Sequence, residues 1–374
     1  MSNTKIPEKV KNQLLIKSGG RCQYKGCNES LYQDLVTKRS FNISYIAHIV
    51  ADEPNGPRGC KIRSKLLAQE LGNLMLMCDK HHRLIDKIDV AGHPEKLLLE
   101  WKVEHEERIE VVTSINPNSH SHIITYKANI GQHSPTFDFK YLANYLLPDF
   151  YPAQTSTIDL GLADSPFRDK DKIFWDAELN ALETNYTQRL ETLLRQNHIS
   201  HISLFAFAPM PLLIKLGTLI NDIHNVEIHQ PIRNPKTWNL SKEVIPINYK
   251  IIEPIEKNPI VALNISLSAS IDNSRITNVL GEKCSIYTIT IDNPFNDFLQ
   301  TKGQLNEFSK LIRLLFNQIK SEYDSSIEIN IFPAMPIATA IELGRVWMPK
   351  ADMPLTIYDE NKINEGFFKT IEIK

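Results

Sequence analysis

The chain has 374 residues, of which 42% are hydrophobic and 23% are charged. This composition excludes a mainly disordered protein and leaves room for two or three domains. Lys and Arg number 42 against 44 Asp and Glu, a formal net charge of −2, so no overall basicity indicates a nucleic-acid partner. The first 100 residues carry 16 basic and 11 acidic side chains, a net charge of +5. This mildly basic N-terminal third is compatible with contacts to phosphate groups.

The N-terminal residues contain no apolar segment of the kind found in signal peptides. The longest apolar stretch, 202–220, is interrupted by Pro209, Pro211 and Lys215, and it predicts a buried strand, turn and helix instead of a membrane span. Five cysteines, an odd number, argue against a disulfide framework. We therefore expect a cytoplasmic protein that does not contact a membrane.

The first third of the chain predicts short elements of both kinds. A helix over 8–17 should end at the two glycines that follow it, and a strand over 41–50 should carry His48 near its end. After a proline- and glycine-rich turn, we expect a short helix over 64–71 and a second strand over 74–78, which Asn73 opens.

A helix with Asp79 as its N-cap should then carry two histidines and Asp86. A long amphipathic helix follows Pro94, and its expected apolar positions are Leu97, Leu98, Trp101, Val103, Ile109 and Val112. Residues 113–121 have the composition of a linker. We therefore place a first domain at 1–112 and a second at 122–374.

Two pairs of metal-ligating side chains lie in the first domain. Cys22 and Cys27 are separated by four residues, and Cys78 and His81 by two. Two such pairs, separated by a structured insert, suit a closed tetrahedral Zn²⁺ site, which can supply about 10–16 kcal/mol of apparent binding free energy. The alternative, ordinary buried cysteines, explains the paired spacing less well.

A second set of polar residues has the order histidine, asparagine, histidine. His82 points about 100° away from His81 on a helix, so it is available for another role, together with His48 and Asn73. This arrangement and the surrounding segments resemble the HNH, or ββα-metal, nucleases. The resemblance covers residues 1–112 and implies an α+β fold stabilised by the zinc site.

The resemblance implies hydrolysis of a phosphodiester in double-stranded DNA. An imidazole has an ordinary pKa of about 6.5, which suits His48 as the general base. His82 is the expected ligand of a catalytic Mg²⁺ or Mn²⁺ ion, and Asn73 is expected to orient His48 or to hold its loop. Many HNH sites have an acidic metal ligand before the first histidine, where this chain has Ala47. Asp86 is on the same helical face as His82 and can supply the carboxylate that is missing at Ala47. Alternatively, Asp86 is a surface residue that pairs with Arg83 or Lys87.

Basic side chains of the first domain are candidates for contacts with the DNA backbone, although charge runs are usually solvated surfaces. They are Lys11, Lys17, Lys25, Lys38, Arg39, Arg58, Lys61, Arg63 and Lys65.

The second domain contains an internal repeat. The segment 205–217 aligns with 332–344, and each copy has a phenylalanine, a proline and a later Leu-Gly pair between two strand-like segments. The pattern predicts strand, proline turn, helix and strand, used twice in parallel α/β sheets. Chance similarity between apolar segments is the alternative.

The second domain resembles the SAVED domain, which is itself related to a fusion of two CARF-type sensor units. Together, the two domains resemble the HNH–SAVED effector nucleases of bacterial anti-phage (CBASS) signalling. The resemblance implies that a cyclic di- or trinucleotide binds the second domain and drives a homo-oligomer to a larger assembly, which then cleaves DNA.

Ligands of parallel α/β sheets bind beyond the carboxyl ends of the strands, where helix N-termini offer N–H groups to phosphate. The candidate ligand-binding residues at the turns of the two copies, and just beyond them, are Pro209, Met210, Lys215, Arg233, Lys236, Trp238, Met335, Pro336, Arg345 and Tyr358. Trp238 is a candidate for stacking on a base, which contributes about 1–3 kcal/mol.

Two other functions fit parts of the pattern. One is a modification-dependent HNH restriction endonuclease, in which the second domain reads modified DNA. The charge of −7 on residues 101–374 argues against it, because DNA-reading domains usually gain affinity from positive charge. The other is a zinc-containing DNA-binding regulator without catalysis, which leaves the histidine and asparagine set unexplained.

Overall fold

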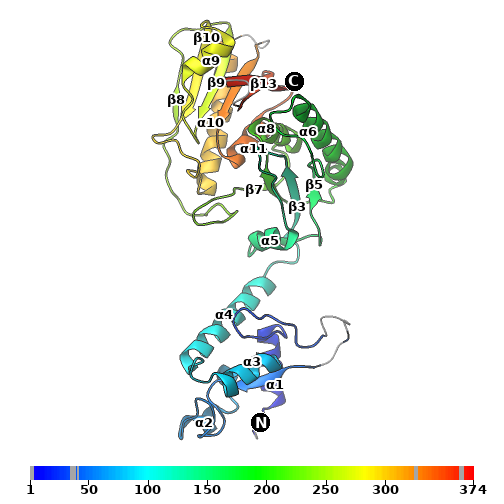
Figure 1. Cartoon of the computed structure of the whole chain (residues 1–374), viewed down its shortest axis with the longest axis vertical. Helices are drawn as coiled ribbons and strands as arrows, with labels where there is room; N and C mark the ends of the chain where they lie inside the picture. Colours follow the sequence, from blue (N-terminus) through cyan, green and yellow to red (C-terminus); the bar gives the residue numbers. More distant parts are fainter. Residues whose placement is uncertain (1–3, 34–38, 40–41, 324–326, 362–365) are drawn as a thin grey trace. The chain divides into compact units, whose positions relative to one another are not determined.

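The computed structural model of the chain describes residues 4–33, 39, 42–323, 327–361 and 366–374. The chain forms two compact units, Met1–Asn116 and Pro117–Lys374 (Figure 1). Each unit has its own hydrophobic core. The boundary lies within the expected linker at 113–121. In the described part of the chain, no helix is both long enough and apolar enough to cross a membrane.

The N-terminal unit consists of short elements around one antiparallel pair of strands. Its elements, in chain order, are α1 (Glu8–Ser18), β1 (Tyr45–His48), α2 (Arg63–Leu67), a 3₁₀ turn (Leu71–Asn73), β2 (Leu74–Met77), α3 (Asp79–Arg83), a π turn (Leu84–Ile88) and α4 (Glu95–Thr113).

Several of these elements are shorter than the sequence predicts. β1 begins at Tyr45, and Phe41, where the expected strand begins, lies outside the described residues. The helix expected over 64–71 ends at Leu67, and a 3₁₀ turn follows. Asp79 is the first residue of α3, and the N-cap is Cys78, whose backbone is extended. The Asp79 carboxylate pairs with Arg83.

The buried face of α4 differs from the expected apolar face. Leu98 is buried as predicted, but Val103 and Val112 are exposed, and Lys102 and His105 are buried in addition. The two polar side chains are tolerated because each has a partner: the Lys102 ammonium pairs with Glu106, and His105 Nε2 donates to the carbonyl oxygen of Ser18 at 2.9 Å. The bond from His105 attaches α4 to α1, whereas the Lys102 pair lies within α4.

The C-terminal unit alternates strands and helices. Its first half contains β3 (His120–Lys127), α5 (Phe139–Ala143), β4 (Tyr151–Pro152), β5 (Ile158–Asp159), α6 (Lys172–Asn185), α7 (Thr192–Arg195), β6 (Ile202–Phe207), α8 (Met210–Ile220) and β7 (Val226–His229). Its second half contains β8 (Lys250–Ile252), β9 (Ile260–Ser266), α9 (Asn273–Leu280), β10 (Cys284–Thr290), α10 (Lys302–Glu322), β11 (Ile329–Ala334), α11 (Ile337–Val346), β12 (Leu355–Asn361) and β13 (Gly366–Ile373).

The two halves form two sheets with a shared internal order. The first sheet has the order β4-β3-β6-β7, with β5 beside β3, and all of its pairs are parallel. The second has the order β13-β12-β11-β9-β10-β8, parallel at its centre and antiparallel at both edges. The series β3-β6-β7 and β9-β11-β12 correspond, and α8 and α11 follow equivalent strands. The unit therefore has the expected α/β architecture, and the two copies of the repeat occupy equivalent places.

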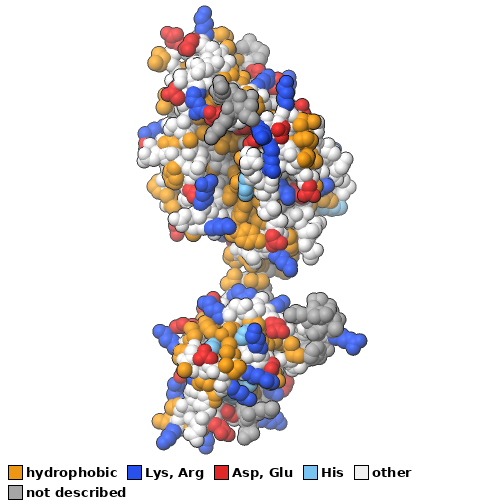
Figure 2. Space-filling view, viewed as in Figure 1, with side chains coloured by type: hydrophobic (Ala, Val, Ile, Leu, Met, Phe, Trp, Pro, Cys, Tyr) orange, Lys and Arg blue, Asp and Glu red, His pale blue; other side chains and the backbone are white. Residues whose placement is uncertain are grey.

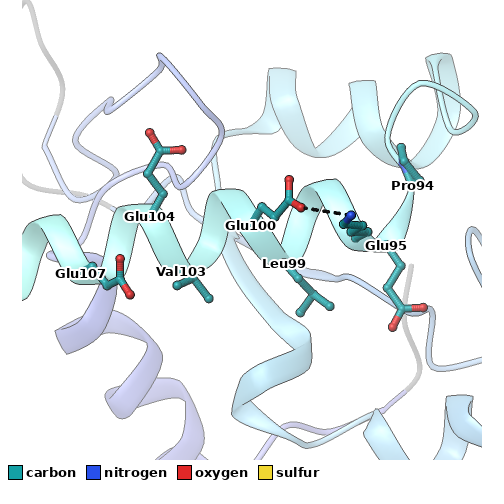
Figure 3. Close-up of a pocket in the computed structure, with 8 residues that line it drawn as sticks. Pro94, Glu95, Leu99, Glu100, Val103, Glu104 and Glu107 are labelled. Atoms are coloured by element: carbon teal, nitrogen blue, oxygen red, sulfur yellow. Dashed lines mark ion pairs between the residues drawn. The ribbon is translucent and has the colours of Figure 1, made fainter.

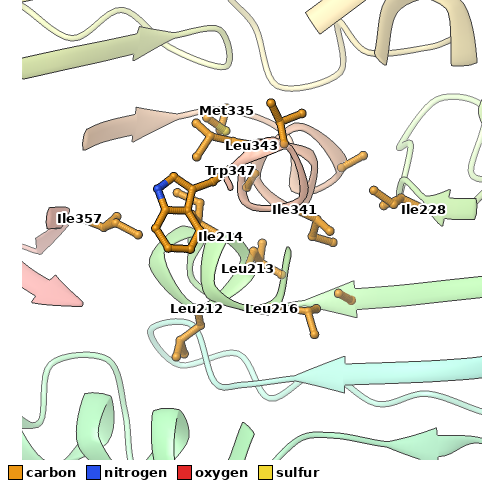
Figure 4. Packing of buried hydrophobic residues seen from close by; sticks show 14 of the residues in the cluster. Leu212, Leu213, Ile214, Leu216, Ile228, Met335, Ile341, Leu343, Trp347 and Ile357 are labelled. Carbon is orange, nitrogen blue, oxygen red and sulfur yellow. The ribbon is translucent and has the colours of Figure 1, made fainter. Parts of the chain in front are cut away.

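Helices α8 and α11 pack directly against each other between the two sheets, surrounded by leucine and isoleucine side chains (Figure 4). Their contact is closest at Gly217 and Gly344, the glycines of the repeat. A Cβ atom on Gly217 would overlap the carbonyl oxygen of Ile341, and one on Gly344 would overlap that of Ile214. The repeated glycine is therefore required because the two helix backbones touch at this point.

Candidate functional site

Four metal-ligating side chains converge in the N-terminal unit. Cys22 and Cys27 lie in the loop after α1, Cys78 follows β2, and His81 is on α3. Their ligand atoms all lie within 4.8 Å of one another. The Cys22 and Cys78 Sγ atoms are 3.8 Å apart, which agrees with the edge of about 3.8 Å that Zn–S bonds of about 2.3 Å give in a tetrahedron.

The chemistry of this cluster also fits a cation. Burial raises the pKa of the Cys22 and Cys78 thiols and lowers the pKa of His81. Burial therefore favours the neutral forms of Cys22, Cys78 and His81, and a Zn²⁺ ion would supply the positive charge that stabilises thiolates. Cys22, Cys27, Cys78 and His81 are the residues that would hold it.

Neighbouring side chains hold the cluster in place. Gln23 joins the cysteine loop to β2, because its N–H donates to the Leu76 carbonyl at 2.9 Å and its Oε1 accepts from the Leu76 N–H at 2.7 Å. The Tyr24 ring stacks on His81 with 4.0 Å between ring centres. The Tyr24 hydroxyl lies 3.1 Å from Nε2 of His93. Because His93 Nδ1 donates a hydrogen bond to the Asp89 carbonyl, Nε2 accepts the hydrogen bond from Tyr24.

His48 ends β1 and is buried, with 7% of its surface exposed. Its Nε2 lies 2.9 Å from the carbonyl oxygen of Ala68. Because a carbonyl only accepts, Nε2 carries the proton and Nδ1 keeps a lone pair. Nδ1 is therefore the atom of His48 that can accept a proton.

Asn73 holds the backbone that follows His48. Its Oδ1 accepts from the N–H of Val50 at 2.8 Å, and its Nδ2 donates to the carbonyl of Val50 at 2.8 Å and to that of Leu67 at 3.2 Å. The Asn73 amide, directly before β2, thus holds the backbone of Val50, two residues beyond His48.

His82 and Asp86 face each other one helical turn apart, with 3.3 Å between Nε2 and Oδ2. Burial lowers the pKa of His82, and the Asp86 carboxylate opposes this shift. Two ligand atoms on one octahedral ion with bonds of about 2.1 Å are about 3.0 Å apart, so the pair fits a shared divalent ion. The surface partners expected for Asp86 were wrong: Arg83 pairs with Asp79, and Asp86 Oδ1 accepts from Arg58 Nη2 at 2.6 Å.

Most of the basic side chains proposed for DNA contact have acidic partners within the N-terminal unit. Lys11, Lys17, Lys25 and Arg63 each pair with a glutamate, and Figure 2 shows both signs of charge over the visible surface. Arg58 is enclosed, with a side chain only 7% exposed, so its proposed contact with the DNA backbone is wrong. Lys38 lies outside the described residues.

An open groove of about 750 Å³ follows the outer face of α4 (Figure 3). Leu99 and Val103 line it, flanked by Glu95, Glu100 and other glutamates. It is not formed by His48, Asn73 or His82, and its acidic edges do not suit a phosphate backbone.

The C-terminal unit has a pocket of about 670 Å³ at the carboxyl ends of β6 and β11, within the size range of small-ligand sites. Six of the predicted ligand-binding residues line it: Met210, Arg233, Lys236, Trp238, Met335 and Pro336. Pro209 is the N-cap of α8, one residue before Met210. The two turns also touch, because the Met335 N–H donates to Met210 Sδ at 3.5 Å.

Three other predicted residues have partners away from this pocket. Lys215 pairs with Glu183 at 2.7 Å, and Arg345 is buried beside Glu342 and donates to the His224 carbonyl. Tyr358 is buried against Phe332 and donates to Asn330. Their sequence positions indicated the correct elements, but their side chains serve packing and internal pairing.

Two residues at these sites have roles that the sequence did not indicate. Arg58 contacts both the carbonyl oxygen of His48 and the carboxylate of Asp86, which faces His82. Its position between a proline and a glycine gave no indication that its side chain is buried. Gln230 lines the pocket, and its Oε1 accepts from the Ala338 N–H at 2.8 Å. One of the α11 N–H groups expected to be free for phosphate is therefore already bonded. The position of Gln230, directly after β7, was the available signal.

Comparison with solved structures gives distant similarities. The chain is 13% identical to the Acinetobacter baumannii Cap4 SAVED/CARF-domain containing receptor with the cyclic trinucleotide 2'3'3'-cAAA, covering 74% of this chain and 55% of that one, with a TM-score of 0.44. With the same receptor bound to the cyclic trinucleotide 3'3'3'-cAAA, the identity is 13%, the coverage is 74% of this chain and 59% of that one, and the TM-score is 0.43. With the Moraxella osloensis Cap4 SAVED/CARF-domain containing receptor, the identity is 12%, the coverage is 75% of this chain and 58% of that one, and the TM-score is 0.42. The chain thus spans less than two thirds of the length of these receptors.

Among curated proteins, no match was found. Residues 182–373, just over half of the chain, match the SAVED family, described as the SMODS-associated and fused to various effectors sensor domain. The chain therefore belongs to the SAVED sensor-domain family.

Proposed function

We propose that this protein is a cyclic-oligonucleotide-activated, metal-dependent endonuclease for double-stranded DNA that acts as an effector of CBASS anti-phage signalling. In this proposal the N-terminal unit is an HNH nuclease with a structural Zn²⁺ ion. The C-terminal unit is the sensor, and ligand binding drives assembly of a larger homo-oligomer that cleaves DNA.

The observation that carries the nuclease proposal is the placement of three side chains: His48 ends β1, Asn73 directly precedes β2, and His82 is on α3. His48 Nδ1 keeps a lone pair while Nε2 donates to Ala68, which suits removal of a proton from an attacking water. Asn73 restrains the following backbone through its bonds to Val50, which limits movement of the imidazole.

His82 and Asp86 are the side chains that would hold the catalytic Mg²⁺ or Mn²⁺ ion. When bound, such an ion supplies positive charge beside the phosphate and the leaving oxygen. The burial that lowers the pKa of His82 keeps its imidazole neutral, as a metal ligand must be. These features support the assignment of His82 and Asp86 as one site.

Family membership and the pocket at the β6 and β11 ends support the sensor proposal. The pocket combines two cationic side chains, Arg233 and Lys236, with the Trp238 indole. Cations suit the phosphates of a cyclic nucleotide, and an indole suits a base. The contact between the two turns at Met210 and Met335 means that one ligand would touch both copies of the repeat.

The test is cleavage of a plasmid by the purified full-length protein with Mg²⁺, with and without a panel of cyclic di- and trinucleotides. We expect cleavage with one ligand only, and its loss in His48→Ala. The control is His105→Ala, which removes another buried histidine bonded to a carbonyl but outside the site. Its activity per folded molecule should match that of the wild type.

Other outcomes would change the proposal in defined ways. Cleavage without any cyclic nucleotide would contradict the sensor role and would favour the modification-dependent restriction endonuclease. Cleavage that survives in His48→Ala would contradict the assignment of the general base.

A further inference from the structure

Arg58 is a buried arginine between the two halves of the candidate nuclease site. Its Nε donates to the Ile49 carbonyl at 2.6 Å, its Nη1 to the Ile85 carbonyl at 2.7 Å, and its Nη2 to Asp86 Oδ1 at 2.6 Å. Longer contacts reach the carbonyl oxygens of His48, at 3.4 Å, and His93, at 3.5 Å. One guanidinium therefore contacts the backbone that follows β1 and the turn that carries Asp86.

These contacts join segments that are far apart in the sequence. Ile49 is adjacent to His48, and Asp86 faces His82. A guanidinium is planar and holds its donors at fixed angles, so acceptors on opposite sides cannot move independently. Lysine has the same charge but no such fixed geometry.

The backbone of Arg58 supports a role for its side chain. Its φ is +57°, in the left-handed region where non-glycine residues cost about 1 kcal/mol or more. Glycine would be the locally preferred residue. The turn is otherwise held by backbone bonds, from the Gly59 N–H to Gly56 and from the Ala51 N–H to Pro57, so an arginine is not needed to close it.

We propose that Arg58 is a positioning residue of the candidate nuclease site, and this inference rests on the function proposed above. Its guanidinium sets the position of His48 relative to the His82–Asp86 pair and orients Asp86 through one carboxylate oxygen, while the other oxygen faces His82. It does not contact the DNA.

The test compares Arg58→Lys and Arg58→Gly in the full-length protein. Arg58→Lys retains the charge and loses the planar geometry. Arg58→Gly suits the backbone conformation and leaves space for added guanidinium ion. Arg108→Lys is the control, because Arg108 bonds to Asn28 and His105, away from the site. The readouts are kcat and KM for plasmid cleavage, Mn²⁺ affinity by electron paramagnetic resonance, and folded fraction by circular dichroism.

For Arg58→Lys we expect kcat per folded molecule to fall about 10–100-fold and Mn²⁺ affinity to weaken by about 10-fold or more, as for other residues that orient metal ligands. KM for DNA should stay within about two-fold, since Arg58 is enclosed. Guanidinium at about 20 mM should partly restore kcat in Arg58→Gly, whereas the same concentration of NaCl should not. Arg108→Lys should match the wild type.

Wild-type kcat and Mn²⁺ affinity in folded Arg58→Lys would overturn the inference. The inference would also be overturned if both variants failed to fold and guanidinium did not restore the folded state of Arg58→Gly, since Arg58 would then be purely structural. If the wild type binds Mn²⁺ but cleaves no DNA with any ligand, the proposed activity fails. Weaker Mn²⁺ binding in Arg58→Lys would then still support the positioning role, whereas unchanged binding would overturn it. Absence of Mn²⁺ binding in the wild type would also overturn it.

Discussion

Gly217→Ala should destabilise the C-terminal unit although alanine favours helices. In an open helix interior this substitution would stabilise by about 1 kcal/mol. Here the new methyl group would lie 2.9 Å from the Cα of Gly344 and would overlap the Ile341 carbonyl. Backbone atoms cannot rotate away as a side chain can, so α8 and α11 must separate. We expect an overpacking cost at the upper end of the usual range, about 3 kcal/mol, and a net loss of about 2 kcal/mol.

Differential scanning calorimetry of the full-length protein measures this effect. A net loss of about 2 kcal/mol should lower one unfolding transition by roughly 4–8 °C. The matched control is Gly303→Ala in α10, where a Cβ atom would meet only the Thr301 hydroxyl at 3.7 Å, and no loss is expected. The double variant Gly217→Ala/Gly344→Ala should lose less than the sum of the single variants, because the first methyl already separates the helices. A Gly217→Ala protein as stable as the wild type would refute the requirement for glycine.

Three further predictions test other sites. Cys78→Ser should reduce bound zinc, measured by mass spectrometry, from about one ion per chain to almost none, whereas Cys284→Ser, on β10 of the other unit, should leave it unchanged. Trp238→Ala should weaken binding of the activating cyclic nucleotide by about 1–3 kcal/mol in calorimetric titration, and Tyr358→Phe should not; equal effects would contradict the position of the pocket. Burial lowers the pKa of His229 to about 4, so between pH 6.5 and 4 the unfolded chain binds a proton that the folded chain does not. Stability is therefore lost as the pH falls, by about 2 kcal/mol at pH 5, and urea unfolding of His229→Gln should show a smaller loss between pH 7 and pH 5 than the wild type.

Local sequence was informative where the pattern repeats or the spacing is short. The aligned Phe, Pro and Leu-Gly positions predicted two strand, turn and helix units, and β6–α8 and β11–α11 have this form. The spacing of the cysteines also indicated which side chains come together, because one pair lies in a short loop and the other within one helical turn. Within each copy of the repeat, and within each pair of metal-ligating residues, the positions concerned lie no more than 12 residues apart.

Contacts between distant segments could not be predicted in this way. Arg58 looked like a surface charge, and its burial depends on acceptors at Ile49 and Ile85 that meet only in the folded unit. Lys215 was placed on the correct helix, but its direction depends on Glu183 of α6. Val103 on α4 is exposed, and the helix instead buries His105. The partner of His105 is the Ser18 carbonyl of α1, a contact between distant segments that no local pattern predicts.

The backbone contact between α8 and α11 has a consequence for the proposed cyclic-nucleotide site: the ring size of the ligand and its base preference would depend on different parts of the structure. The two helices that begin at the strand-to-helix turns touch backbone to backbone where Gly217 meets Gly344, and no side chain at that point can adjust the distance between them. Under the proposed function, that distance would limit the size of the ring, whereas the surrounding loops would contact its phosphates through Arg233 and Lys236 and its bases through Trp238. Loop substitutions can therefore change base preference over evolution while ring size stays constant. A change of ring size would require both helices to shift together, so we expect related sensors to diversify first in the bases they accept.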